Sequence, residues 1–447
     1  MITDALSSLL AGLEVFRPAL TEPGFRNFTV LFAGWVCTTG THAVTAALVV
    51  TGVSGRRHHE AFHRFYSRGT WSPDELGRLI FVSLLAHVSG AVRVAIDDTL
   101  ATKKGPEVFG LGCHLDAVRS TKKHKVFAFG HVWVVLAVLI CVPFSNRTWA
   151  LPILFRLYRN KKECKKHGGA YFKKTELARQ MLDVLAGWVG EREVYVAADN
   201  AYCNDTVIGG VASTIHFFGS MRPDAVLTGY PPKRRKGKRG RPALRGKAVP
   251  KPEQIAASGR YPWETCKLTL YGKRVQVRYK TVIAQWYRAC GTAPVRIVIV
   301  ACTRGTLPFR VFFSTDAKLT PKEVLEGYAE RWGIEVCFRD LKQAFGFGDS
   351  SARKRQAVER TAPFVGLSYT LLVLWFLEGA SAVGYAVMPV RPWYRHKTGL
   401  CFNDVLRAAQ HVLARLDVLD PGRDVANLRL TRSHSRKPAR RPLPHAA

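Results

Sequence analysis

Four side chains suited to binding phosphate and metal lie on one predicted helix in the last third of the chain. This helix starts at a capping box of Thr320 and Glu323, has proline at its first position, and runs to Gly346. At about 100° per residue, an arc of about 60° holds four residues: Tyr328, Arg331, Glu335 and Lys342. A solvated stripe of ion pairs would not account for the tyrosine, so this face is a candidate site for phosphate chemistry.

Two further carboxylates are expected where apolar strands end. Asp97 follows the strand RVAI, and Asp199 ends VYVAA. Carboxylates that cluster bind Mg²⁺, and two such ions can cleave a phosphodiester. Asp98 is a second candidate for the first position, and strand alternation lets only one of the pair face the site.

The first acidic strand is followed by the basic residues Lys103 and Lys104. If the strand ends at Asp97, these lysines would lie beside the carboxylate and bind the phosphates of a substrate. An acidic residue at a strand end more often caps a turn or helix, so neither aspartate decides the matter alone.

The overall charge favours a polyanionic partner. Lys and Arg outnumber Asp and Glu by 67 to 33, giving a formal charge of +34. Such a surface attracts nucleic acid; membrane binding and a ribosomal role are the alternatives that composition leaves open.

The ten cysteines and the apolar runs indicate a protein of the cytoplasm, with no membrane partner. No C-x-x-C pair occurs, and Cys164 with His167 is a lone ligand-like spacing for which a structural role is expected. The start of the chain lacks the pattern of a signal peptide and predicts a short amphipathic helix. The apolar runs 132–142 and 364–377 predict a buried strand and a core helix.

The chain divides into four predicted regions, in an α/β fold. Residues 1–90 read as a helical DNA-binding domain, with Ser72 and Pro73 starting a helix. Residues 91–202 and 319–380 form a catalytic core with a mixed sheet and flanking helices. Residues 203–318 are a β-rich insertion with a basic loop at 231–252, and residues 381–447 are a C-terminal region with a basic tail.

These motifs together resemble a known family. The signature Y-x2-R-x3-E-x6-K, formed by Tyr328, Arg331, Glu335 and Lys342, is similar to that of bacterial insertion-sequence transposases of the DDE class. IDDTLATKKG and VAADNAYCN resemble the first and second acidic motifs of that family. The resemblance covers roughly residues 55 to 380.

The resemblance implies a ribonuclease H-like core in which Asp97, Asp199 and Glu335 bind two Mg²⁺ or Mn²⁺ ions. It implies that Tyr328, Arg331 and Lys342 hold phosphates near the scissile bond, and that a homodimer binds the inverted ends of a mobile element and the target DNA. In that family an insertion tryptophan stacks on a base displaced from the duplex, and Trp263 or Trp286 is expected to do so here.

Three classes of function remain to be compared. A transposase would cut the element ends and transfer the 3′-hydroxyl strands without a nucleotide, and no P-loop motif occurs in the chain. A catalytically inactive, transposase-derived DNA-binding protein would bind with a steep salt dependence but cut nothing. A basic membrane protein would require detergent; proline and charge interrupt the apolar runs, which disfavours it.

Overall fold

The computed structural model describes residues 2–105, 107–232, 241–302, 308–388, 393, 399–414 and 416–419. Part of the predicted basic loop, residues 233–240, and the predicted basic tail from residue 420 onward lie outside the described residues.

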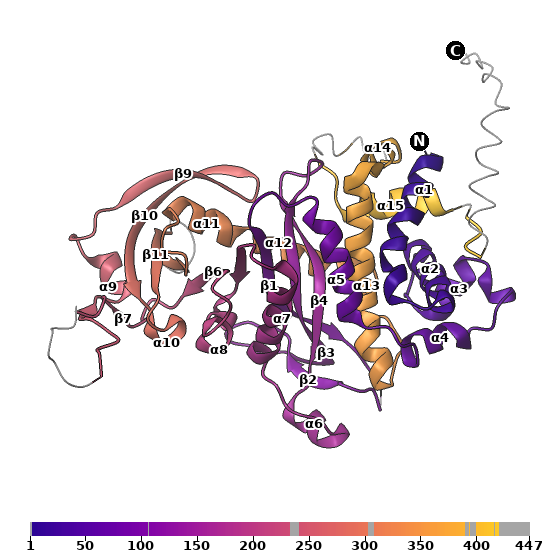
Figure 1. Cartoon of the computed structure of the whole chain (residues 1–447), viewed down its shortest axis with the longest axis horizontal. Coiled ribbons are helices and arrows are strands. Elements are labelled where there is room, and N and C mark those ends of the chain that lie inside the picture. The colour runs from indigo at the N-terminus through magenta and orange to yellow at the C-terminus, as the bar shows by residue number, and fades with distance from the viewer. Residues whose placement is uncertain are drawn as a thin grey trace, which may run out of the picture.

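Helices pack together at the N-terminus, at the end of the molecule opposite the insertion (Figure 1). These helices are α1 (Ile2–Leu13), η1 (Glu14–Ala19), α2 (Glu22–Cys37), α3 (Val44–Val50), η2 (Val53–Gly55), α4 (Glu60–Ser67) and α5 (Pro73–Leu85). Ser72 precedes Pro73 at the start of α5, as predicted. Phe28, Phe62 and Phe65 are buried where the helices meet.

A mixed sheet with helices on both faces follows. Its elements are β1 (Val92–Thr102), β2 (Gly112–Leu115), β3 (Phe127–Cys141), β4 (Thr148–Tyr158), α6 (Lys161–His167), α7 (Lys174–Val189), β5 (Val194–Ala198), η3 (Asn200–Tyr202), α8 (Asp205–Ile208) and β6 (Ile215–Met221). The core strands lie in the order β4, β3, β1, β5, β6; β3 is antiparallel to its neighbours, and β1, β5 and β6 are parallel. The predicted ribonuclease H-like α/β fold is confirmed.

The β-rich segment that follows continues this sheet. Its elements are β7 (Leu227–Thr228), β8 (Ala248–Val249), α9 (Pro252–Ala257), β9 (Glu264–Leu270), β10 (Lys273–Gln285), α10 (Tyr287–Cys290), β11 (Pro294–Ala301) and β12 (Phe309–Ser314). Strand β12 pairs antiparallel with β6, with Phe313 opposite Gly219, so hydrogen bonds join the insertion to the core. Strand β6, which the sequence placed in the insertion, pairs parallel with β5 of the core.

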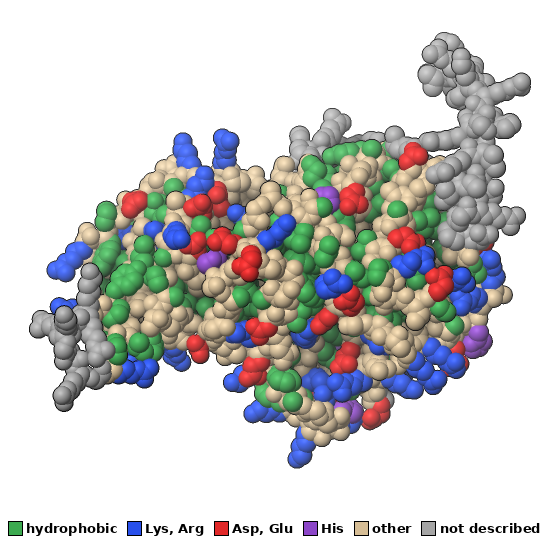
Figure 2. All heavy atoms as spheres, viewed as in Figure 1, with side chains coloured by type: hydrophobic (Ala, Val, Ile, Leu, Met, Phe, Trp, Pro, Cys, Tyr) green, Lys and Arg blue, Asp and Glu red, His purple; other side chains and the backbone are tan. Residues whose placement is uncertain are grey.

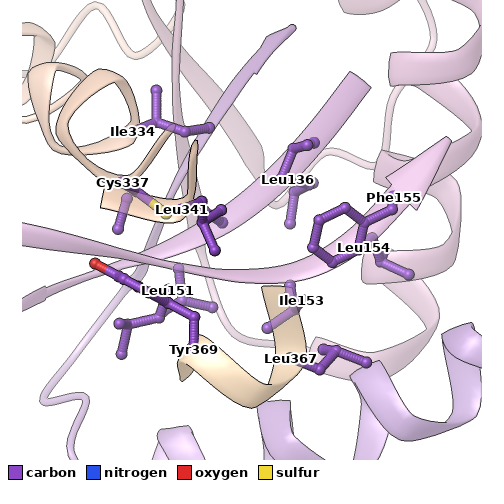
Figure 3. Close-up of a cluster of buried hydrophobic side chains, with 14 of the residues drawn as sticks. Leu136, Leu151, Ile153, Leu154, Phe155, Ile334, Cys337, Leu341, Leu367 and Tyr369 are labelled. Carbon is purple, nitrogen blue, oxygen red and sulfur yellow. The ribbon is translucent and has the colours of Figure 1, made fainter. Parts of the chain in front are cut away.

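The C-terminal helices close the core. They are α11 (Pro321–Ala329), α12 (Trp332–Ala344), α13 (Arg355–Trp375), the π-helical turn η4 (Phe376–Ala380), α14 (Ser381–Ala386) and α15 (Phe402–Leu413). Figure 3 shows Ile334, Cys337 and Leu341 of α12 meeting β3 and β4 side chains, with Leu367 and Tyr369 of α13 nearby. This packing holds α12 against the sheet.

One helical stretch in the described ranges, Arg355–Ala386, is long and apolar enough to cross a membrane. Of its most apolar window, 78% is buried inside the protein. Its apolar side chains therefore lie in the core that the sequence predicted for residues 364–377.

Candidate active site

Strands β1 and β5 bring Asp97 and Asp199 next to each other. Ile96 is in register with Ala198, the last residue of β5, so Asp97 and Asp199 come next on the two strands. Neighbouring strands lie about 4.8 Å apart, and residues in register point to the same face. The two aspartates, separated by a hundred positions in the sequence, are therefore side by side.

Arg331 joins Asp97 to Glu335. Its Nη1 donates to Oδ2 of Asp97 at 3.1 Å, and its Nη2 donates to Oε1 of Glu335 at 2.6 Å. The arginine side chain is only 14% exposed. Its Nε is buried and has no hydrogen-bond partner among the described residues. Two of the three predicted acids thus contact one guanidinium, which keeps a donor without a partner among the described residues.

The predicted single helix is two helices. Helix α11 ends at Ala329 and α12 begins at Trp332, with a turn at Glu330 and Arg331. Helix α11 packs on the insertion strands, whereas α12 packs on β4 and β1. The prediction of one continuous helix from 320 to 346 is wrong at this turn, which contains the residue that contacts both acids.

The other two signature residues lie on opposite sides of this turn. The ring of Tyr328 packs on Phe312 with ring centroids 4.8 Å apart, and the Arg331 guanidinium lies 5.7 Å from the tyrosine ring centroid. Lys342 lies seven residues beyond Glu335, about 10 Å along α12. Burial lowers the pKa of Lys342, although Asp116 and Asp98 act in the opposite direction. The two acids whose charges act on Lys342, Asp116 and Asp98, are not the acids that Arg331 contacts.

Asp98 faces away from this cluster. Its Oδ2 accepts from Nζ of Lys174 at 2.6 Å, and its Oδ1 accepts from the hydroxyl of Tyr202 at 2.6 Å. Lys174 belongs to α7, whereas Arg331 lies in the turn before α12, and neighbouring residues of a strand point to opposite faces. Of the two adjacent aspartates, Asp97 is the one that faces Arg331.

Strand β1 is longer than the sequence suggested. It remains paired with β3 as far as Thr102 opposite Gly130, so Asp97 lies in its interior and not at its end. Lys103, six residues beyond Asp97, is about 20 Å away along an extended strand. Its Nζ donates to the carbonyl of Gly348 at 3.2 Å. The expectation that Lys103 and Lys104 lie beside the first carboxylate is wrong.

Burial disfavours the charged form of the first acid in this cluster. Burial raises the pKa of Asp97 to about 7, even though Arg331 opposes the shift. Among the residues that the structure describes, no group of three His, Cys, Asp or Glu residues is arranged to hold a metal ion as it stands. The donors present are carboxylate oxygens, the ligands that Mg²⁺ and Mn²⁺ prefer. A divalent cation fits the chemistry of the cluster, and at present the Arg331 guanidinium lies between two of its acids.

Two exposed aromatic residues lie beside the cluster, and sequence reasoning missed both. Tyr271 is 61% exposed and Trp332 is 49% exposed, and their ring centroids are 6.1 Å apart. Tyr271 and Gly272 form the turn between β9 and β10, with φ of 53° and 75°. A type I′ turn requires positive φ at both of its central residues. Asparagine is usual at the first of these positions, and tyrosine is strained there. The sequence signal that could have predicted this turn is a Tyr-Gly pair between two strands of alternating polarity.

The two predicted insertion tryptophans have other partners. Trp263 lies under two cations, with Lys280 Nζ 4.7 Å and the Arg278 guanidinium 5.5 Å from its ring centroid. Trp286 packs edge-on against Phe313 with ring centroids 5.1 Å apart. Neither contact involves the signature residues, whereas Trp332 directly follows Arg331 in the chain.

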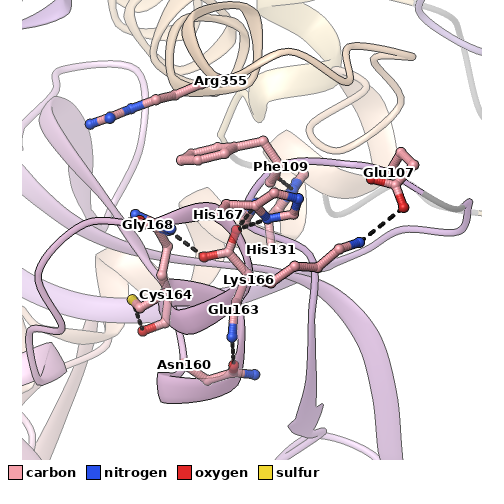
Figure 4. A network of polar contacts seen from close by, with 12 residues as sticks. Glu107, Phe109, His131, Asn160, Glu163, Cys164, Lys166, His167, Gly168 and Arg355 are labelled. Carbon is pink, nitrogen blue, oxygen red and sulfur yellow. Dashed lines mark hydrogen bonds and ion pairs between the residues drawn. The ribbon is translucent and has the colours of Figure 1, made fainter.

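The Cys164 and His167 pair has the predicted structural role. His167 Nδ1 lies 2.8 Å from Oε1 of buried Glu163, which also pairs with Arg159 and accepts from the backbone of Gly110 (Figure 4). The thiol of Cys164 points at backbone carbonyls. Glu163 therefore ties α6 to the segment that follows β1.

Comparison with known proteins identifies two matching families. The family described as "DDE superfamily endonuclease" matches residues 15–284, well over half of the 447 residues, and this stretch contains Asp97 and Asp199. The family described as "Archaeal putative transposase ISC1217" matches residues 287–378, which contain Glu335. None of the curated proteins matches the chain.

Proposed function

The chain belongs to the DDE superfamily of endonucleases, and from that premise we propose that it is a transposase that cuts the ends of a mobile element and transfers the 3′-hydroxyl strands to target DNA. One observation carries the proposal. The Arg331 guanidinium bonds Asp97 of β1 and Glu335 of α12, while Asp199 directly follows the adjacent strand β5. Two of the three acids, separated by more than a hundred positions, thus contact one guanidinium.

Asp97, Asp199 and Glu335 are the residues proposed to hold the metal. Enzymes of this superfamily generally use divalent metals, and two Mg²⁺ or Mn²⁺ ions would activate a nucleophile and stabilise the leaving oxygen. We propose that Arg331 neutralises two of these acids in the free protein and turns to a DNA phosphate when substrate binds. Its unpartnered Nε supports this role, because a phosphate oxygen would satisfy the buried donor.

The remaining signature residues are proposed to position DNA. Tyr328 holds the Arg331 guanidinium over its ring, and Lys342, about 10 Å from Glu335, would contact a phosphate about three nucleotides away from the scissile bond. Tyr271 and Trp332 replace Trp263 and Trp286 as the proposed partners of a displaced base, because they are exposed beside Arg331.

The larger assembly is also a proposal. Residues 1–90 would bind the inverted repeats, residues 91–202 and 319–380 would form the catalytic core, and residues 203–318 would reach over the active site. A homodimer would bring the two element ends together in the cytoplasm, on the nucleoid. The formal charge of +34 supports the DNA partner.

Incubation of the purified protein with DNA from the flanks of its own gene tests the proposal. With Mg²⁺ or Mn²⁺ we expect nicks at the element ends and joined products, both lost in Glu335→Gln and Asp97→Asn. Asp98→Asn is the matched control, since Asp98 faces Lys174 on the other side of the sheet and its replacement should cost less than about tenfold in rate.

Two outcomes would contradict the proposal. Products that are unchanged in Glu335→Gln would mean that another site does the chemistry. Tight, salt-dependent binding with no metal-dependent cutting by any variant would instead identify an inactive DNA-binding relative.

A further inference from the structure

The β2–β3 hairpin presents an apolar face that no described residue covers. Cys113 pairs with Phe129 and Leu115 pairs with Phe127, so the four side chains point to one face. Leu115 is 46% exposed, Phe127 64% and Phe129 61%. Two exposed phenylalanines add nothing to the core, so their surface is available to a partner.

The turn at the tip of this hairpin is basic, and its own hydrogen bonds hold its conformation. Its exposed cations are Arg119, Lys122, Lys123 and Lys125. The only acid of the turn, Asp116, is buried and accepts from the backbone N–H groups of Val118 and Arg119 at 3.1 Å each. Because the turn is held by its own hydrogen bonds, its cations are presented on a fixed support.

A hollow of about 730 Å³ lies beside the hairpin. Lys103, Lys104, Arg119 and Arg353 line it together with Phe129, and no acidic side chain is among its described lining residues. A hydrogen bond joins the two segments that form this hollow, because the backbone N–H of Phe109 donates to the carbonyl of Arg353 at 3.0 Å. Figure 2 shows Lys and Arg side chains gathered along the lower edge of the molecule, where Figure 1 places β2 and α6. Cations around an exposed aromatic ring suit a polyanion that also offers flat apolar surfaces.

The distance between this hollow and the acid cluster follows from the strand. Lys103 lies six residues beyond Asp97, about 20 Å along β1. One base pair of DNA rises about 3.4 Å, so the same span corresponds to about six base pairs. A duplex that follows β1 from the acids would therefore reach the hairpin within about half a turn.

We propose that the β2–β3 hairpin, with Lys103, Lys104 and Arg353, grips duplex DNA about six base pairs from the phosphate held at Asp97. The cations contact the backbone, and Phe127 and Phe129 enter the minor groove as an apolar wedge. This inference rests on the proposed function, because it places the same DNA on a second surface. The same hairpin of a second copy fits the face less well, since the exposed cations of the two hairpins would repel each other.

Photocrosslinking from two positions tests the inference without requiring catalysis. Full-length protein carrying Phe129→benzoylphenylalanine or Trp332→benzoylphenylalanine is irradiated, without divalent ions, on a duplex taken from the flanks of its own gene. We expect both to crosslink DNA, with the Phe129 position about six base pairs from the Trp332 position.

The remaining outcomes of the crosslinking experiment distinguish a failure of this inference from a failure of the proposed function. A Phe129 crosslink to a second chain, to nothing, or to the same bases as Trp332 overturns the inference and leaves the proposed function standing. If neither position crosslinks DNA, the proposed function fails as well.

Binding measurements provide an independent test. Phe127→Ser with Phe129→Ser should weaken duplex binding about tenfold, whereas the control Tyr385→Ser, on an equally exposed aromatic of α14, should not. Changing Lys122, Lys123 and Lys125 to Gln should reduce the slope of log affinity against log salt by up to about 2.7. An unchanged affinity and an unchanged slope would both contradict the proposal.

Discussion

The ion pair between Arg331 and Asp97 should be strongly coupled in the metal-free protein. The perturbation is a double-mutant cycle made of Arg331→Met, Asp97→Asn and the variant carrying both changes. The Arg331 side chain is 14% exposed and the Asp97 side chain is 20% exposed, and their closest atoms are 3.1 Å apart. Water therefore screens this pair less than it screens a surface pair.

The magnitude follows from this partial burial. Removing one partner of a fully buried pair costs about 3–5 kcal/mol, and the residual exposure here reduces the expected cost of Arg331→Met to about 2–3 kcal/mol. Asp97→Asn removes the carboxylate that burial disfavours, so we expect it to be neutral or stabilising. The coupling free energy should be about 2 kcal/mol.

Urea unfolding followed by circular dichroism, with chelator present, measures the four free energies. The control cycle is the pair of Arg26 and Glu22, whose closest atoms are 3.0 Å apart but whose side chains are 69% and 52% exposed. An exposed pair should couple by less than about 1 kcal/mol. If both cycles gave the same small value, the description of Arg331 as the counter-ion of the acid cluster would be refuted.

Two further predictions concern His131 and the exposed aromatics. Burial lowers the pKa of His131 to about 4, so the unfolded chain takes up its proton first as the pH falls from about 6.5. The free energy of unfolding should therefore drop by about 3 kcal/mol by pH 4. The variant His131→Gln, assayed by urea unfolding across this pH range, should lack that part of the loss. If the two unfolding profiles run parallel, His131 is not the cause. Tyr271→Asn relieves the strain of the left-handed backbone conformation and should raise the free energy of unfolding by about 1 kcal/mol. Tyr271→Asn and Trp332→Ala should each slow strand cleavage at least about tenfold, with little change in duplex affinity. Equal losses of affinity and rate would show that these rings serve binding alone.

Sequence patterns located the helical signature but not its shape. The capping box at Thr320 did start a helix, because its hydrogen bonds are local. The break at Glu330 and Arg331 could not be predicted, since α11 packs on strands of the insertion and α12 packs on β4 and β1, which lie far away in the sequence. In such a case the sequence predicts the local hydrogen bonds of the helix cap, but not the strands against which the helix packs.

The first acidic motif shows the same limit. Alternation along a strand predicted that only one of Asp97 and Asp98 faces the site, but the choice depends on which helix covers which face. The end of β1 was also misplaced, because its pairing with β3 continues through residues that carry no strand pattern of their own. The position of Lys103 depended on that pairing.

The continuous pairing from β6 through β12 limits how the insertion can be lost or replaced. Residues 218–221 of β6 hydrogen-bond to β12 over four register positions. A shortened protein without the insertion would expose this strand as a bare edge, and such edges template aggregation. Any viable deletion of the insertion must therefore supply a substitute strand, or a charged or proline-bearing segment, to shield β6.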